Sequence, residues 1–344
     1  MPWDVPLTAA DDSYTHQAVA PAAATAYADT AWAERCWHVV YLGDGWMAGA
    51  GRAVWPHGGR RTARAGVNTG AVQLSRRVEE PFLLGSDPND GTTGPVTIET
   101  VEPLREARLV LDEPGLDFGF DLTYRARFPA VASDRNLIER EGQVLTDYMN
   151  FFQSGLYSGI VRAEGKERRV EGRAGFRDRG WGLRKHEGAA RRGLHIACMC
   201  EFPDEALYIL LYETGSARRV FTNGWLLDER GVADRVTEVE HELSFDGTLM
   251  TGGALRATFA SGAARELAVT VEARLWISTL GYTTDPELEG PGTSRFDVTD
   301  PETRRRIAGV YEQGCRFESD GRTGHGFLET GLGQHARYLP GEPG

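Results

Sequence analysis

The chain has 344 residues, of which 41% are hydrophobic, and its formal net charge at pH 7 is −12. This length predicts two domains or one large all-β unit, and the apolar share is sufficient for substantial cores. The negative charge argues against nucleic acid or an anionic membrane surface as a partner, and no apolar run is long enough for a transmembrane segment.

The first residues predict an arm rather than a domain. Residues 1–30 are rich in Ala, Thr and Asp, a composition typical of an extended segment. The N-terminus lacks the basic and apolar regions of a signal peptide, so the expected compartment is the cytoplasm. The sequence indicates no oligomeric state.

Alternation with a period of two predicts antiparallel strands along most of the chain. Apolar and polar side chains alternate over residues 117–126 and again over residues 266–275. Residues 194–202 and 206–213 flank Pro203-Asp204-Glu205, which predicts a hairpin. Many short strands separated by glycine-rich turns favour barrels or sandwiches over a parallel sheet with crossover helices.

The composition changes near residues 130–150, where one set of strands ends. We therefore predict an N-terminal β domain over residues 31–147 and a C-terminal β domain over residues 148–338. Residues 339–344 are expected to form a tail. Residues 283–305 predict a loop with one short helix, which is either a lid or a surface decoration.

The four cysteines do not predict a disulfide framework or a metal site. Cys198 and Cys200 lie two apart on a predicted strand and read as small buried apolar residues. A zinc site would need two further ligands at finger-like spacing, and none occur. The sequence also lacks glycine-rich phosphate loops, so we expect neither a metal nor a nucleotide cofactor.

The segment from Arg177 to His186 carries the densest chemical signal in the chain. Arginines surround one aspartate, Asp178, and Trp181 lies between two glycines. An aspartate taken out of water must be paired or hydrogen-bonded, or it becomes a proton donor. We therefore expect a turn at the polar end of an apolar cavity, directly after a strand over residues 168–176.

This segment and the residues before it follow a pattern known from other proteins. After Phe152-Gln153-Ser154-Gly155, the matching positions are Arg177, Asp178, Trp181, Gly182 and Arg184. The pattern resembles the Arg-Asp-His-Ser-Trp-Gly-x-Arg-like turn of a superfamily that includes AttH-like proteins and the carotenoid 1,2-hydratases (hydroxyneurosporene synthases). Arg179 and Gly180 replace the His and Ser of that pattern, so no role of that imidazole or hydroxyl carries over.

The resemblance covers most of the chain from about residue 30 and implies an all-β fold. Its two domains would be lipocalin-like (calycin-type) antiparallel β-barrels or sandwiches in tandem. The superfamily spans hydratases, pericyclases and other members, so the fold does not fix the reaction.

Asp178 is the leading candidate for a catalytic acid. Hydration of an isolated alkene needs a carboxylic acid kept protonated by desolvation, with aromatic faces near the developing cation. Neighbouring arginines would instead depress the pKa of the aspartate if they point at it. Asp178 is therefore either the proton donor or one half of a structural ion pair.

Two histidines lie on predicted strands and are further candidates. His241 falls on an apolar face, where it is either a base or substrate anchor, or a core histidine bonded to a backbone carbonyl. His195 shares one strand face with Glu201, and that face is turned either to a cavity or to solvent.

A second carboxylate would complement Asp178. Glu312 and Glu329 lie on the two closing strands and either could supply it, unless both are exposed rungs of the sheet. The substrate-contact candidates include two tryptophans that are otherwise core residues, and two arginines that would hold the acid in place. The full set is Trp181, Arg177, Arg184, Trp225, His195 and Tyr157.

These features predict a cofactor-independent enzyme of the hydratase or cyclase type, either a carbon–oxygen lyase or an isomerase. It would act by acid catalysis on a carbon–carbon double bond of a hydrophobic, isoprenoid- or polyketide-like substrate. A non-catalytic carrier of a hydrophobic small molecule and a pericyclase that uses the same cavity are the alternatives.

Overall fold

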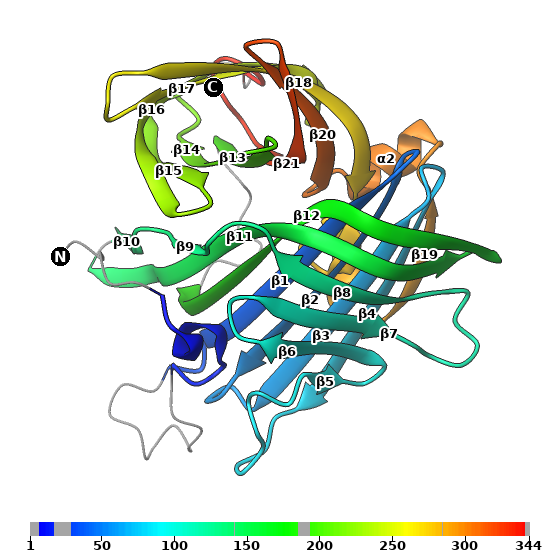
Figure 1. The fold of residues 1–344 in the computed structure, drawn as a ribbon. Coiled ribbons are helices and arrows are strands. Elements are labelled where there is room, and N and C mark those ends of the chain that lie inside the picture. Colours follow the sequence, from blue (N-terminus) through cyan, green and yellow to red (C-terminus); the bar gives the residue numbers. More distant parts are fainter. Residues whose placement is uncertain (1–6, 17–28, 141, 185–192, 284, 341–344) are drawn as a thin grey trace.

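The protein is built almost entirely from antiparallel strands, which form two assemblies (Figure 1). The computed structural model describes residues 7–16, 29–140, 142–184, 193–283 and 285–340. Within those residues no helix has the length and apolar character needed to cross a membrane.

The first assembly is a 13-stranded sheet, curled into a half-barrel in Figure 1. From one edge to the other its main path runs β19-β4-β3-β2-β1-β12-β11-β8-β7-β6-β5, and β9 and β10 pair with β11. The strands are β1 (Trp32–Gly43), β2 (Trp46–Trp55), β3 (Arg60–Asn68), β4 (Val72–Pro81), β5 (Thr92–Thr93), β6 (Val96–Glu102), β7 (Glu106–Leu111), β8 (Phe118–Ala126), β9 (Val131–Ala132), β10 (Asn136–Arg140), β11 (Gln143–Ala163), β12 (Lys166–Arg184) and β19 (Gly292–Asp297).

The second assembly is a closed barrel, because its last strand pairs with its first. Its strands are β13 (Leu194–Glu201), β14 (Ala206–Glu213), β15 (Arg219–Asp228), β16 (Gly231–Asp246), β17 (Leu249–Phe259), β18 (Ala264–Leu275), β20 (Glu312–Ser319) and β21 (Arg322–Leu332). Closure leaves no unpaired edge strand. The two assemblies confirm the predicted all-β class with tandem β-barrel domains.

The predicted strands at 117–126, 194–202, 206–213 and 266–275 correspond to β8, β13, β14 and β18. The predicted turn after Phe176 is wrong, since β12 continues without a break to Arg184. The division between the two assemblies also differs from the predicted one near residue 148. The two longest strands, β11 and β12, belong to the first sheet. That sheet therefore continues through Arg184, and the barrel begins at Leu194.

The segment between β18 and β20 contains more structure than the predicted loop with one helix. It holds the 3-10 helix η3 (Ile277–Leu280) and the short helices α1 (Pro286–Glu289) and α2 (Pro301–Ile307). Between those helices, β19 pairs with β4 of the first sheet over six residue pairs. This pairing anchors the segment and links the two assemblies.

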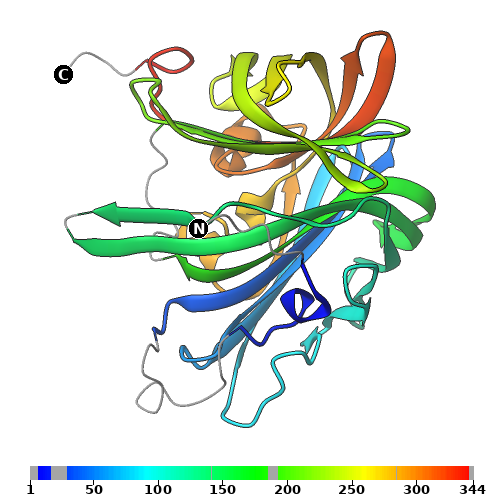
Figure 2. The ribbon, with the colours of Figure 1, turned by 60° about the vertical axis from the view of Figure 1, so that its left-hand side comes forward.

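Three apolar clusters follow from the alternation of side chains along the strands. One fills the half-barrel and a second fills the closed barrel, where Cys198 and Cys200 are buried. The third lies between the assemblies and includes Trp37, Phe176 and Phe327. Figures 1 and 2 agree that β11 and β12 lie near the barrel, and β1 and β2 also contribute residues to this third cluster.

Part of the predicted N-terminal arm is folded onto the first sheet. The 3-10 helix η1 (Ala9–Asp12) is capped by Thr8, and Tyr14 belongs to the half-barrel core. In both views η1 lies on the side of β12 that is turned away from the barrel. The predicted tail begins at Leu339, which pairs with His335. Residues 341–344 of that tail lie outside the described residues.

Candidate active site

Strand β12 presents two chemically different faces, because successive side chains of a strand point to opposite sides. Phe176 and Asp178 point toward the barrel, where the Phe176 ring packs against Phe327 with 5.1 Å between centroids. Arg177 and Arg179 point the other way, toward the half-barrel and the N-terminal segment. The clustered charges of the sequence are therefore separated by the sheet.

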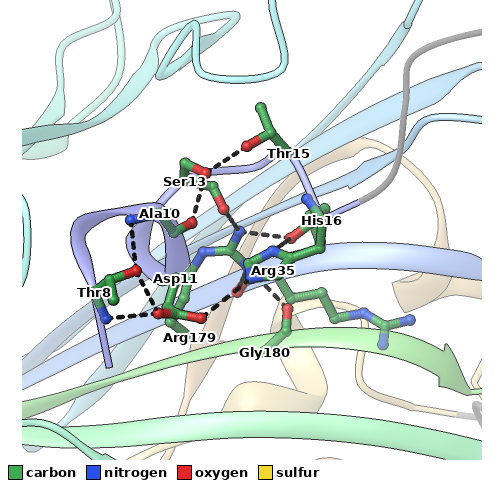
Figure 3. A network of polar contacts seen from close by, with 10 residues as sticks. Thr8, Ala10, Asp11, Ser13, Thr15, His16, Arg35, Arg179 and Gly180 are labelled. Carbon is green, nitrogen blue, oxygen red and sulfur yellow. Dashed lines mark hydrogen bonds and ion pairs between the residues drawn. The ribbon is translucent and has the colours of Figure 1, made fainter. Parts of the chain in front are cut away.

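The arginines on the half-barrel side are held by the N-terminal segment. Arg177 makes a bidentate ion pair with buried Asp12, with both N–O distances at 2.9 Å. Arg179 donates to the Glu34 carboxylate at 2.6 Å and to the Ser13 carbonyl (Figure 3). These arginines have their own carboxylate partners, so the predicted role of Arg177 in holding Asp178 does not fit its position.

Trp181 lies on the same side as these arginines. Its ring stacks on His16 at a centroid distance of 4.0 Å. The two glycines that flank Trp181 allow β11 to approach closely: a Cβ atom at Gly180 would lie 1.8 Å from the Tyr148 hydroxyl, and one at Gly182 would lie 2.1 Å from the Asp147 carbonyl oxygen. These contacts explain the glycines without a turn.

Across from Asp178, the barrel contributes two glutamates. The register that pairs Gly314 with Phe327 and Tyr311 with Thr330 places Glu312 opposite Glu329 on β20 and β21. Side chains at opposing positions of an antiparallel pair lie about 5 Å apart at Cβ, and like charges there repel each other. Two carboxyls in this arrangement favour a state in which they share one proton.

Burial of Asp178 and Glu312 favours their protonated forms. It raises the pKa of Asp178 to about 7, the charge of Arg184 lowers that pKa, and the charge of Glu329 raises it. Burial also holds the pKa of Glu312 well above its usual range, and the charges of Glu329 and Asp178 raise it further. Because the charges of these side chains change one another's pKa values, Asp178, Glu312 and Glu329 form one interacting group, which we call the carboxyl cluster.

The members of the carboxyl cluster differ in access to solvent. Glu312 is 2% exposed, and its Oε2 has no hydrogen-bond partner among the described residues. Asp178 and Glu329 are partly exposed, and His195 Nδ1 lies 3.1 Å from Glu329 Oε1. The His195 ring in turn stacks on Tyr212. A buried acid is thus connected through Glu329 to an imidazole that reaches solvent.

The first sheet surrounds Asp178 with aromatic and cationic side chains. Trp37 is the direct neighbour of Asp178 across β1 and β12, and it is buried in the cluster between the assemblies. The guanidinium groups of Arg184 and Arg35 both lie over the Tyr148 ring, at 4.7 and 5.8 Å from its centroid. Burial raises the pKa of Tyr148, and the charge of Arg184 lowers it.

Other candidates from the sequence lie apart from the carboxyl cluster. His241 points into the barrel, where it contacts Glu213 at 3.3 Å and the Tyr338 hydroxyl at 2.7 Å. Burial lowers its pKa, and the charge of Glu213 raises it. Tyr157 lies inside the half-barrel, where it donates to the Phe176 carbonyl and contacts His38 Nδ1 at 3.0 Å.

Trp225 and Glu201 lie between the assemblies. Trp225 belongs to the same apolar cluster as Trp37. Glu201 faces the first sheet, as His195 does, and pairs with Arg127 at 3.0 Å. Burial raises the pKa of Glu201 to about 7. The apolar face of β13 fills the barrel, which explains why its polar face is turned toward the other assembly.

Sequence reasoning did not identify Trp37, Arg35 or Tyr148 as residues near Asp178. Trp37 and Arg35 alternate with Cys36 on a strand that reads as core, so only the pairing of β1 with β12 could reveal their position. A small pocket inside the half-barrel, lined by residues that include His38, Leu109 and Tyr157, lies on the opposite side of the sheet from Asp178. Asp178 lies instead on the face of the sheet that is turned toward the barrel, where it is partly exposed.

Solved structures share this fold at low sequence identity. An AttH-like protein from Nitrosomonas europaea aligns with a TM-score of 0.56 and 14% identity, over 95% of this chain and 98% of that chain. CghA with Sch210972 aligns with a TM-score of 0.52 and 12% identity, over 93% and 96%. Kievitone hydratase from Nectria haematococca aligns with a TM-score of 0.49 and 13% identity, over 87% and 88%.

The likenesses to the AttH-like protein and to CghA show the fold expected from the resemblance to AttH-like tandem-lipocalin proteins. No curated protein matches the sequence. One family model covers residues 7–287, which is most of the chain and includes β12. The chain belongs to this family, which is described as a family of unknown function, DUF8625.

Proposed function

We propose that this protein is a cofactor-independent enzyme of the hydratase or cyclase type that protonates a carbon–carbon double bond. The observation that carries the proposal is the carboxyl cluster, in which Asp178 from one assembly faces Glu312 and Glu329 from the other. Burial keeps part of this cluster protonated near neutral pH, which is the property that a general acid for an unactivated alkene requires.

Asp178 is the proton donor in this proposal, because it combines a raised pKa with partial exposure. Its O–H bond breaks as the alkene π pair forms a new C–H bond, and the other alkene carbon becomes cationic. The indole of Trp37 and the carboxylates beside it are suited to stabilise that positive charge.

Glu329 is the base that completes the reaction. In a hydration, a water oxygen bonds to the cationic carbon and passes one proton to the Glu329 carboxylate. In a cyclisation, a second double bond attacks the cation, and Glu329 takes the proton that restores neutrality. The proton returns to Asp178 through the carboxyl cluster, so neither route consumes acid. The contact with His195 orients Glu329 and links it to solvent.

A hydrophobic substrate is supported by the apolar side chains that lie beside the carboxyl cluster. Trp37, Phe152 and Phe176 from the first sheet meet Ala197 and Phe327 from the barrel in one apolar cluster. Apolar surfaces bind isoprenoid- or polyketide-like chains by burying apolar area. They offer few hydrogen-bond partners to the polar groups of a ligand.

The test is incubation of the purified protein with a panel of terpenoid and polyene substrates in ¹⁸O-labelled water, followed by mass spectrometry. A product heavier by one labelled water supports a hydratase, and an isomer that contains solvent deuterium after reaction in D₂O supports acid-initiated cyclisation. Both products must be absent with Asp178→Asn.

Two outcomes would favour the alternative functions. Binding of panel compounds without any product would indicate a carrier of hydrophobic small molecules. An isomeric product without solvent deuterium that still forms with Asp178→Asn would indicate a pericyclase, because a pericyclic reaction needs no proton transfer from an acid.

A further inference from the structure

The face of the barrel that is turned toward the first sheet carries ordered rows of side chains. Residues paired across neighbouring antiparallel strands lie side by side on one face. The pairings Asn223–Leu210, Leu210–Ala197 and Ala197–Glu329 define a row that crosses four strands, from β15 to β21. Glu312 extends this row onto β20. One end of the row is therefore the carboxyl cluster, and the other end is Asn223.

The rows on either side differ in packing. On one side, Trp225, Tyr208, Met199 and Phe327 are buried against the first sheet. On the other side, the partly exposed rings of Phe221, Tyr212 and His195 contact one another in sequence, with centroid distances of 6.1 and 4.6 Å. The middle row is thus flanked on one side by a row of aromatic rings that are partly exposed to solvent.

The middle of the row is apolar and only partly covered. Ala197 has the smallest side chain in the row, and Leu210 is incompletely buried although it packs against the cluster between the assemblies. Neighbouring strands are separated by about 4.8 Å, so three strand steps place Asn223 about 14 Å from Glu329. A molecule that spans this row needs an extended apolar body.

Asn223 itself is an unusual residue for this position. It is 2% exposed, and neither its amide nitrogen nor its amide oxygen has a hydrogen-bond partner within the described part of the chain. Buried amides nearly always have partners, because desolvation without a hydrogen bond is costly. Its neighbours in the row are apolar and cannot supply one. The Asn223 amide is thus the polar group of this row that is able to bind a donor and an acceptor of another molecule.

We propose that Asn223 binds a neutral polar end group of the substrate, one that presents a hydrogen-bond donor beside an acceptor, as a carboxamide does. This inference rests on the proposed function, since it places the reacting double bond at the carboxyl cluster. The amide of Asn223 donates to the carbonyl of that group and accepts from its N–H. The acidic end of the row and the net charge of −12 disfavour an anionic end group.

The test compares two probes of equal chain length, undecylenamide and undecene, which differ by the carboxamide. Their dissociation constants are measured by titration of intrinsic tryptophan fluorescence in the Asp178→Asn protein, which the proposal makes unable to turn them over. We expect undecylenamide to bind about tenfold more tightly than undecene. We expect Asn223→Leu in the same background to abolish this preference and leave the affinity for undecene unchanged.

A matched control replaces an exposed amide, Gln143→Leu, and is expected to keep the preference. Equal affinity for the two probes, or a preference that survives Asn223→Leu, would overturn the inference and indicate that Asn223 is satisfied by water alone. Should Asn223→Leu not fold, Asn223→Asp keeps the size of the side chain and removes the N–H₂ donor. It is expected to lose the preference as well.

The two proposals fail in different experiments. The affinity comparison uses a variant without turnover, so its outcome does not depend on whether the panel yields a product. Product formation in the wild type with no amide preference would leave the proposed function intact and refute the role of Asn223. A preference for the amide probe without any product from the panel would support the role of Asn223 and refute the proposed enzymatic function.

Discussion

Glu312 lies opposite Glu329 across two neighbouring strands of the barrel, and Asp178 approaches this pair from the other assembly. Three carboxyls around one buried position are unfavourable if all are ionised. Perturbed carboxyls of this kind are common at functional sites, which is why the proposed function places the reaction here. Its consequences can be measured.

Asp178→Asn is expected to abolish turnover while the fold and the affinity for substrate remain. The amide has the size of the carboxyl and cannot donate a proton at a comparable acidity, so we expect a loss of about 100-fold or more in kcat. Asp121→Asn is the matched control, because Asp121 is exposed on β8 and pairs with Arg108. Retention of kcat in Asp178→Asn would refute Asp178 as the acid.

The pH dependence of the reaction is expected to follow the protonation of Asp178. The acid form is active, so kcat/KM should fall as the pH rises through about 7. Arg184→Met removes a positive charge that lowers this pKa, and it should move the falling limb to higher pH by about half a unit. The shift is measured from profiles of kcat/KM against pH for the wild type and Arg184→Met. A falling limb at the same pH in both proteins would contradict the assignment of this limb to Asp178.

Stability should respond to pH with the sign opposite to that of a carboxylate in a salt bridge. The pKa of Asp178 is about 7 in the fold against 3.8 ordinarily, so the folded state holds a proton that the unfolded state has lost. The free energy of unfolding is therefore unaffected by the ionisation of Asp178 below about pH 4, and it decreases as the pH rises from about 4 to about 7. Glu201 contributes in the same direction.

Asp178→Asn provides the control for that dependence. Relative to the wild type, this variant should gain stability at about pH 8, on the order of 1–3 kcal/mol, and gain little at about pH 4. Urea unfolding at both pH values measures the difference. A variant that is less stable than the wild type at pH 8 would indicate that Asp178 is ionised and paired.

Arg177→Met is expected to affect stability rather than chemistry. It would leave buried Asp12 without its ion-pair partner, which costs about 3–5 kcal/mol. Asp12→Asn should cost a similar amount, and the double variant should cost less than the sum of the two, because the pair is lost only once. Below the unfolding temperature, kcat per folded molecule should stay near the wild-type value. A specific loss of kcat would place Arg177 in the reaction.

Local patterns in the sequence were sufficient for several strands and for singling out Asp178, one member of the carboxyl cluster. The alternation at 117–126 and 266–275 reports which side of a strand is buried, and that property depends on neighbours within a few residues. The arginines around Asp178 drew attention to a position that the structure places in the carboxyl cluster. They also suggested a pairing that does not exist for Arg177, since alternation sends its side chain to the other face of β12.

What the sequence by itself determined is the all-β class, the approximate positions of several strands, and Asp178 as a candidate acid. The tertiary structure decided which charges act on that acid. Glu312 and Glu329 are more than 130 residues away in sequence, and only the barrel register and the packing of Phe176 on Phe327 bring them to Asp178. The pKa of a buried group depends on burial and on charges a few ångströms away, and those distances are set by the packing of the two assemblies.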